Sequence, residues 1–216
     1  MSFVGRLLGD HSLNDNLEAT GLAVFKEIFK EKSTESVLSD YCDFQEGYVN
    51  PPQEFPQYFD GKVKWLRGVD FSSPIIINTS RTLTDEGFNS AGKSALLFEP
   101  NTIVITKSGT IGKLGIIADY MCGNRATINI KPKSKDLLPF VYFFLKSIQP
   151  QFYDMAVGSA QVNLYVSVLQ QIACPKYDDS FEKFSSQASI LLGKLLENSK
   201  EIIQLSELQE ILLGEL

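Results

Sequence analysis

Apolar residues recur at spacings of three and four near both ends of the chain, a pattern typical of amphipathic helices. Near the N-terminus, Ser12 can cap a helix whose apolar face carries Leu13, Leu17, Val24, Phe25, Ile28 and Phe29. Gly21 lies inside this segment and costs about 1 kcal/mol relative to alanine. We therefore expect the helix to depend on packing against another element.

A longer apolar stripe with the same spacing follows Pro175 and predicts a second helix. Polar Asn198 and Gln209 interrupt its seam, which otherwise comprises Phe181, Phe184, Ala188, Leu191, Leu195, Ile202, Leu205 and Leu212. About 32 residues without proline, each rising 1.5 Å, make a rod of about 50 Å. Such a stripe requires a partner surface, which the first helix, a second copy of the chain, another subunit or the chain's own sheet domain could provide.

Between the helices, short runs rich in branched residues predict the strands of a sheet. The runs are SPIIIN, ALLF, TIVIT, LGIIA and ATINI, and Gly61–Phe71 adds a strand with the single tryptophan, Trp65. Their mixture of alternating and continuous apolar residues indicates a mixed sheet, partly buried on both faces. The segment after Pro139 predicts a helix that covers one face. Val37–Asp60 reads as a surface loop, since it contains three prolines and few regular patterns.

These elements define an α+β fold with three parts. We expect an N-terminal helical segment at residues 1–36, a mixed-sheet domain at residues 37–178, and a long C-terminal helix of the coiled-coil type at residues 179–216. A length of 216 residues with 44% hydrophobic content suffices for one globular domain with an appendage. No apolar run reaches the roughly 18 residues that cross a bilayer, and the N-terminal apolar stretch is too short for a secretory signal, so we expect a cytoplasmic protein.

Cysteine and histidine usage argues against metal and histidine chemistry. Cys42, Cys122 and Cys174 are far apart and odd in number, which favours buried free thiols over disulfides or a metal site. His11 is the single histidine and lies in a polar segment, so neither histidine-based catalysis nor zinc ligation is expected.

Three glycine-containing turns lie among the predicted strands. They are SGTIGK at Ser108–Lys113, GNRA at Gly123–Ala126 and GSAQVNL at Gly158–Leu164. In the first, two glycines allow positive φ and the Ser, Thr and Lys side chains offer donors to a phosphate, although a hairpin that only joins two strands fits equally well.

The other two turns carry side chains that could read bases. Arg125 could pair with guanine and Asn124 with adenine, or the turn could simply lie on the surface. Gln161 and Asn163 share one face of a predicted strand, where a structural role competes with base reading. Trp65 also has two interpretations: it is either an aromatic contact to nucleic acid or a core residue flanked by charges.

In this order, and followed by a long helix, the three turns resemble the target recognition domain of type I restriction-modification specificity subunits. Asn14–Phe29 (NDNLEATGLAVFKEIF) resembles the tail of the central conserved helix that precedes the second recognition domain of such subunits. Leu195–Leu216 (LLENSKEIIQLSELQEILLGEL) resembles the conserved region that ends them. The resemblance spans almost the whole chain.

The resemblance implies a non-catalytic subunit that reads one half of a bipartite double-stranded DNA sequence. Its helices would set the spacing between the half-sites, and methyltransferase (modification) subunits would dock on it. S-adenosylmethionine and ATP are then expected only on partner subunits. A second recognition domain would come from another half of a longer subunit or from a second copy of this chain through the long helices.

A net charge of −6 is unusual for a protein that neutralises phosphates, but the acidic residues are concentrated at the ends. Residues 40–150 hold 12 basic and 11 acidic side chains, whereas residues 151–216 hold 4 and 9. The candidate DNA contacts, with lysines on phosphates and arginines and Asn124 on bases, are Lys62, Lys64, Arg67, Arg81, Lys93, Lys107, Ser108, Lys113, Asn124 and Arg125. The candidate interface with another helix or partner comprises Phe184, Leu191, Leu195, Ile202, Leu205 and Leu212.

Two other functions fit parts of the sequence. Gly87–Ser94 (GFNSAGKS) satisfies the pattern of a phosphate-binding P-loop, which would make the chain a nucleotide-binding protein. However, no apolar strand runs into Gly87, and Pro100 would end any helix that begins at Lys93. The long helix is also compatible with a coiled-coil adaptor whose globular domain binds protein.

Overall fold

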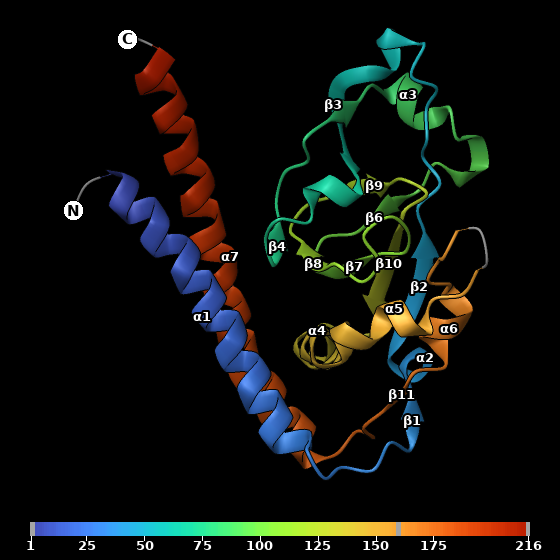
Figure 1. Cartoon of the computed structure of the whole chain (residues 1–216), viewed down its shortest axis with the longest axis vertical. Helices are drawn as coiled ribbons and strands as arrows, with labels where there is room; N and C mark the ends of the chain where they lie inside the picture. Colours follow the sequence, from blue (N-terminus) through green and yellow to red (C-terminus); the bar gives the residue numbers. More distant parts are fainter. Residues whose placement is uncertain (1–2, 159–160, 215–216) are drawn as a thin grey trace.

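The computed structural model describes residues 3–158 and 161–214, with residues 3–9, 11, 213 and 214 as backbone only. Two long antiparallel helices, α1 (Phe3–Phe29) and α7 (Asp179–Gly214), form a stalk, and residues 36–174 form a head beside it (Figure 1). The expected α+β fold with a mixed sheet and a long C-terminal helix is confirmed.

The two helices of the stalk meet through an aromatic contact and a polar layer. Near the base, the ring centroid of Phe184 lies 5.3 Å from that of Phe25 and 5.7 Å from that of Phe29. Further along, Asn198 Nδ2 donates to Asn14 Oδ1 (2.9 Å), and Asn14 Nδ2 donates to Ser199 Oγ (3.2 Å). The polar interruption of the α7 stripe at Asn198 is therefore a buried, hydrogen-bonded layer between the helices.

The predicted start of the first helix was wrong. Ser12 does not cap α1 but lies exposed in its interior, because the helix begins at Phe3. Asn198 Nδ2 donates to the Asp10 carbonyl (2.6 Å), so α7 supports the helix on the N-terminal side of Ser12. Leu13, assigned to the apolar face, is 46% exposed, whereas its neighbour Asn14 is buried at the seam.

A five-stranded sheet, which we call the central sheet, forms the middle of the head. Its strand order is β2-β10-β7-β8-β4, antiparallel except for the parallel pair β4 and β8. The bounds are β2 Cys42–Glu46, β4 Ile75–Ile76, β7 Thr102–Thr106, β8 Leu114–Ile117 and β10 Thr127–Pro132. All residues of β7 and β8 are buried. One face of the central sheet packs on α4 (Leu137–Ile148), and the other face packs on a second sheet, described next.

The second sheet is smaller and has the order β5-β3-β9-β6, with β3 and β9 parallel. Its strands are β3 Phe59–Leu66, β5 Thr82–Leu83, β6 Leu97–Phe98 and β9 Met121–Gly123. A two-stranded pair joins the ends of the head, β1 (Ser36–Val37) with β11 (Ala173–Cys174).

Short helices fill the connections. The α-helices are α2 Leu38–Tyr41, α3 Asp85–Asn89, α5 Phe152–Met155 and α6 Val166–Gln170. The 3₁₀ turns are η1 Pro56–Tyr58, η2 Gly68–Asp70, η3 Gly92–Ser94 and η4 Gln149–Gln151.

The loop predicted for Val37–Asp60 contains regular structure in its first part. α2 and β2 occupy Leu38–Glu46, and β2 forms an edge of the central sheet. An edge strand is buried on one side only, so CDFQE carries too many polar residues to be recognised as a strand from its hydrophobicity. The part that contains the three prolines, residues 47–58, is irregular apart from the single turn η1, as predicted.

Head and stalk share one hydrophobic core. Phe140 of α4 lies 5.8 Å from Phe25 and 5.3 Å from Phe29 of α1, and 4.2 Å from Phe181 of α7, measured between ring centroids. The first half of α7 therefore packs on the first helix and on the head of its own chain, two of the partner surfaces that the sequence left open.

Candidate nucleic-acid interface

The three glycine-containing turns meet at one end of the central sheet. Lys107, just after β7, donates its backbone N–H to the Ala126 carbonyl of the second turn (2.7 Å). Its own carbonyl accepts from the Leu164 N–H of the third (2.9 Å). Since the first turn begins at Ser108, one residue ties together three segments that are far apart in the sequence. We call residues 107–113, 123–126, 157–158 and 161–164 the loop cluster.

The first turn has the geometry that its glycines predicted. Gly109 and Gly112 have φ of 73° and 85°, values that residues with a Cβ rarely adopt. Thr106 fixes the turn, because its Oγ1 accepts from the Lys113 N–H (2.9 Å) and donates to the Thr110 carbonyl. Thr110 is exposed, so the turn presents side-chain and backbone groups outward on a rigid frame.

The second turn positions an exposed arginine. The Arg125 N–H donates to Asn50 Oδ1 (3.1 Å), and its side chain is exposed. Asn124 Oδ1 accepts from the Ala126 N–H (3.0 Å) in a local turn. This bond gives Asn124 a structural role and limits the freedom of its amide to face a base.

The third turn is not part of a strand with Gln161 and Asn163 on one face. Val157 and Asn163 form an isolated antiparallel bridge with N···O distances of 2.9 and 3.0 Å, and Asn163 Nδ2 donates to the Gln161 carbonyl (3.0 Å). Ser159 and Ala160 lie outside the described residues. Only Leu164 and Tyr165 separate this bridge from α6, which begins at Val166, so no strand continues beyond Asn163.

Two of the candidate lysines, Lys64 and Lys107, form ion pairs within the chain. Lys107 Nζ lies 2.8 Å from Glu46 Oε1, and Lys64 Nζ lies 2.8 Å from Asp119 Oδ2 and 2.7 Å from the Ile77 carbonyl. Burial favours a raised pKa for Glu46, but hydrogen bonds from Lys107 and Tyr48 outweigh it and hold the pKa below its usual value. Glu46 therefore stays ionised and already neutralises Lys107 at the loop cluster.

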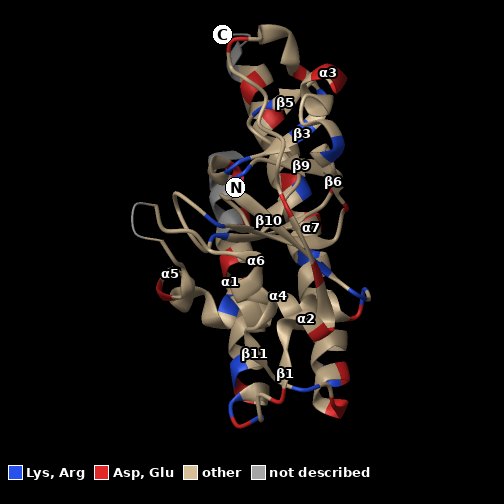
Figure 2. Cartoon of the chain, turned by 90° about the vertical axis from the view of Figure 1, so that its right-hand side faces the viewer, with Lys and Arg blue, Asp and Glu red and all other residues tan. Residues whose placement is uncertain are grey.

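The remaining lysines differ in their surroundings. Lys113 lines a cleft of about 240 Å³ between the head and α1, beside Asp15, Glu18 and Lys146. Lys62 and Lys93 are exposed, and no contact of the described residues joins them to the loop cluster. In the view of Figure 2, Lys and Arg are interspersed with Asp and Glu over the head.

Trp65 is a core residue. Its side chain is 5% exposed, and Nε1 donates to the Val49 carbonyl (2.7 Å).

Two arginines cover the aromatic layer to which Trp65 belongs. Arg67 Cζ lies 5.1 Å from the Trp65 ring centroid, and Arg81 Cζ lies 3.7 Å from that of Phe59. The sequence placed Arg67 beside Trp65 but gave no sign that Arg81 and Phe59 form a matching stack.

The segment Gly87–Ser94 does not have the geometry of a phosphate-binding loop. Gly87 lies inside α3, and a Cβ there would approach the Tyr58 carbonyl to 2.1 Å, so this glycine serves close backbone packing. Only the 3₁₀ turn η3 contains Lys93, whereas a P-loop requires a helix that begins there and aims its N–H groups at phosphate.

Among the described residues, no cluster of three or more His, Cys, Asp or Glu side chains could hold a metal ion, and no helix is long and apolar enough to span a membrane. The side chain of His11 is outside the description. Cys42, Cys122 and Cys174 are free and buried, as predicted. Burial raises the pKa of Cys122 and Cys174 to about 12 and that of Cys42 well above the usual range, so these thiols are protonated at neutral pH.

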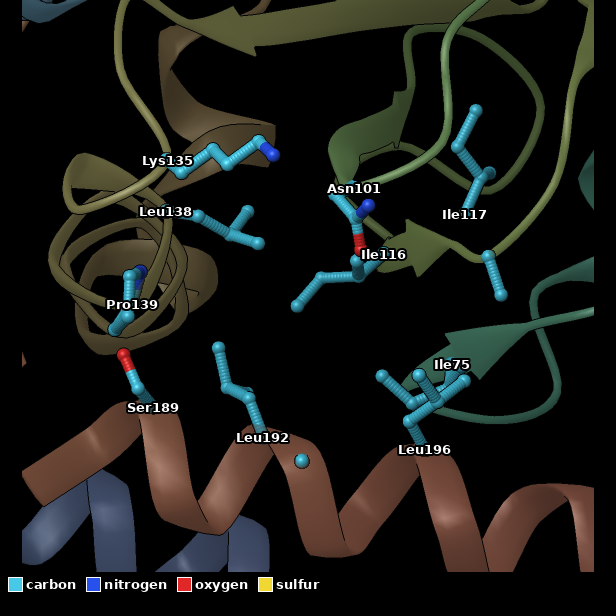
Figure 3. A pocket seen from close by; sticks show the side chains of 12 residues that line it. Ile75, Asn101, Ile116, Ile117, Lys135, Leu138, Pro139, Ser189, Leu192 and Leu196 are labelled. Atoms are coloured by element: carbon cyan, nitrogen blue, oxygen red, sulfur yellow. The ribbon is translucent and has the colours of Figure 1, made fainter.

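An apolar cavity of about 210 Å³ lies between the stalk and the head (Figure 3). Leu192 and Leu196 of α7 face Ile75 and Ile116 of the central sheet across it. Lys135 is the single charged residue of its lining, so it lacks the convergent polar groups of a catalytic pocket.

The loop cluster thus offers backbone groups, hydroxyls and an exposed arginine, and its described residues form no arrangement for nucleophilic or acid–base chemistry. Of the candidate residues, Lys107, Ser108, Lys113, Asn124 and Arg125 come together there. Arg67 adjoins the cluster, because Leu66 pairs with Gly123. The candidate residues on α7 lie partly inside the chain: Phe184 and Leu195 are buried, whereas Leu212 is 59% exposed.

Comparison with known proteins gives a consistent result. The family model described as "Type I restriction modification DNA specificity domain" matches residues 30–175. The type I restriction enzyme MjaIX specificity subunit of Methanocaldococcus jannaschii is 23% identical over 160 residues, which cover 72% of this chain and 37% of that protein.

Solved structures share the fold. The S subunit of a type I restriction-modification system from M. genitalium has a TM-score of 0.66 at 18% identity, over 98% of this chain and 56% of that one. A chain from a structural study of complex assembly and conformational transition in the type I R-M system has a TM-score of 0.60 at 13% identity, over 98% and 55%. This chain therefore spans about half the length of those structures and less of the curated relative.

Proposed function

The chain belongs to the type I restriction modification DNA specificity family, and from that premise we propose that its head recognises one half of a bipartite double-stranded DNA target. The observation that carries the proposal is the joining of the three turns into the loop cluster through Lys107. The cluster combines exposed backbone, hydroxyl and arginine donors, which are the groups that position a protein on the DNA backbone.

The stalk has a separate part in the proposal. Methyltransferase subunits that carry S-adenosylmethionine dock on it, and its length sets the distance between two half-sites. The distal turns of α7 expose Leu208, Ile211 and Leu212, which gives these partners an apolar surface. The second half-site is read by another recognition domain, either within a longer subunit or in a second copy of this chain. The protein acts in the cytoplasm, has no catalytic chemistry of its own and holds neither S-adenosylmethionine nor ATP.

Salt-titrated DNA binding by the chain assembled with methyltransferase subunits tests this function. Wild-type complex is expected to bind duplex DNA with an affinity that falls steeply with salt. Lys113→Ala should weaken binding to all sequences alike and reduce the salt slope by about 1, because a phosphate contact carries no sequence information. Lys183→Ala, an exposed lysine at the base of α7, is the matched control and should leave both quantities unchanged.

The proposal is wrong if the assembled complex binds duplex DNA no better than the methyltransferase subunits do alone. A chain that assembles with these subunits but ignores DNA would be a protein-binding adaptor. Failure to assemble at all would remove the docking part of the proposal.

A further inference from the structure

Two arginines beside the second sheet, Arg67 just after β3 and Arg81 just before β5, are held in the same way. Each guanidinium lies over an aromatic ring, Arg67 over Trp65 at 5.1 Å and Arg81 over Phe59 at 3.7 Å from Cζ to ring centroid. The two rings are buried and touch each other, with centroids 6.0 Å apart. One aromatic pair therefore supports both guanidinium planes and restricts their rotation.

Neutral groups, not carboxylates, fix the two guanidiniums. Arg67 Nη2 donates to Ser80 Oγ (2.8 Å), and Arg81 Nη1 donates to Gln53 Oε1 (2.7 Å). Neither arginine forms an ion pair with an acidic residue of the described chain. Arg67 Nε is buried without any hydrogen-bond partner. Both guanidiniums thus lack a direct carboxylate partner, and each keeps further Nη–H donors.

Asp70 orients Arg67 without forming an ion pair with its guanidinium. Its Oδ2 accepts from the Arg67 backbone N–H (2.7 Å), and its Oδ1 accepts from the Ser80 N–H (2.7 Å) and hydroxyl. Because the Ser80 hydroxyl donates to Asp70, its lone pairs are left to accept from Arg67 Nη2. The carboxylate therefore fixes the direction of the guanidinium through Ser80.

The pair lies next to the loop cluster. β3 ends at Leu66, whose carbonyl accepts from the Asn124 N–H of the second turn (3.0 Å), and Arg67 follows directly. Arg81 is placed beside the same strand, since its carbonyl accepts from the Trp65 N–H (3.3 Å).

We propose that Arg67 and Arg81 are base-reading residues of the head and that each recognises a guanine in the major groove. This inference rests on the proposed DNA-recognition function. A guanidinium fork whose orientation is fixed matches the O6 and N7 acceptors of guanine, the commonest specific contact between protein and DNA. A phosphate contact needs only a flexible point charge, which the exposed lysines supply. Rigid stacking and Nη donors that are not paired directly with a carboxylate suit base reading.

Selection from a randomised DNA duplex by the chain assembled with its methyltransferase subunits tests the inference. Arg67→Lys and Arg81→Lys keep the charge but lose the bidentate fork. Each variant is expected to lose its preference for guanine at one position of the selected half-site, by roughly 5- to 150-fold in relative affinity, and the two positions should differ. Preferences at all other positions should stay as in the wild-type chain.

Ser80→Ala is a second variant that leaves both arginines in place. It should reduce guanine preference at the Arg67 position alone, because it removes the acceptor that orients Nη2. Thermal unfolding of each variant checks that the head is folded. The inference is overturned if the wild-type complex selects a sequence and both lysine variants select the same one with equal preference, or if they weaken binding to every sequence alike. A wild-type complex that binds no duplex at all would instead remove the DNA-recognition function itself.

Discussion

Gly21 lies where α1 of the stalk meets α4 of the head. A Cβ at this position would lie 2.2 Å from Phe143 Cζ, and edge contacts with Tyr142 and Phe184 hold the Phe143 ring. Alanine would add about 1 kcal/mol of helix propensity. Overpacking against a fixed ring costs about 1–3 kcal/mol, so we expect Gly21→Ala to lower the free energy of unfolding, measured by urea denaturation.

Gly193 of α7 provides the matched control. It is exposed, and no atom lies within 4 Å of a Cβ built there. Gly193→Ala should therefore raise the free energy of unfolding by about 1 kcal/mol through helix propensity alone. Stabilisation by both substitutions would show that the α1–α4 contact is looser than the structure indicates.

At the scale of residues, the sequence predicted conformations better than contacts. The positive φ angles of Gly109 and Gly112 follow from glycine in a tight turn, and both are confirmed. The stack of Arg81 on Phe59 was not predictable, because only the pairing of β3 with β5 brings these two residues together. The roles of Ser80 and Asp70 were missed for the same reason.

At the scale of elements, long amphipathic helices and fully buried strands were predictable. α7 and β7 follow from three-four spacing and from a continuous branched run, respectively. The two- and three-residue strands β5, β9 and β11 were missed, since so short a segment has no measurable period. Such strands are defined by their partners in the head and not by their own sequence.

The polar layer of the stalk leads to a prediction about helix pairing. Asn198→Ala would remove the donor to the Asp10 carbonyl and to Asn14 Oδ1, both inside the α1–α7 seam. Buried acceptors without a partner cost about 1–3 kcal/mol, so we expect the free energy of unfolding to fall by about that amount. Chemical denaturation of the purified chain measures it.

A double-mutant cycle separates specificity from stability in this layer. Asn14→Leu and Asn198→Leu are compared singly and together. The double replacement removes both sides of their hydrogen bond and should recover part of the loss, while the Asp10 carbonyl and Ser199 Oγ still lack their side-chain donors. Equal destabilisation by the single and the double replacements would mean that the asparagines are held by packing and not by their hydrogen bonds.

At the scale of the whole molecule, the stalk is attached to the head over its lower half and free of it beyond. Phe181 and Phe184 of α7 are buried against α1 and α4, whereas Leu208, Ile211 and Leu212 are each more than half exposed. The sequence could not show which surface covers the apolar stripe of α7. The same three-four spacing of apolar residues occurs whether a helix packs inside its own chain or on another subunit.

The shared aromatic core implies that head and stalk unfold together. Phe184 contacts Phe25 and Phe29 of α1 and Phe143 of α4, so its removal loosens the stalk and the head at once. Phe184→Ala is expected to cost about 3–5 kcal/mol, as for other buried phenylalanines. Trp65, the single tryptophan, lies in the second sheet and reports the head by fluorescence, while far-UV circular dichroism is dominated by the helices.

In Phe184→Ala, the unfolding transitions measured by Trp65 fluorescence and by circular dichroism should move to lower denaturant concentration by the same amount. Superimposed transitions indicate one cooperative unit. Ile190→Ala, on the exposed side of α7, removes a side chain that is 64% exposed and should leave both transitions in place. A Trp65 transition that stays at the wild-type midpoint while the helical signal shifts would mean that the stalk unfolds independently. A stalk of that kind could not fix the position of the head as the proposed half-site spacing requires, because the two would no longer be coupled through the packing of α4.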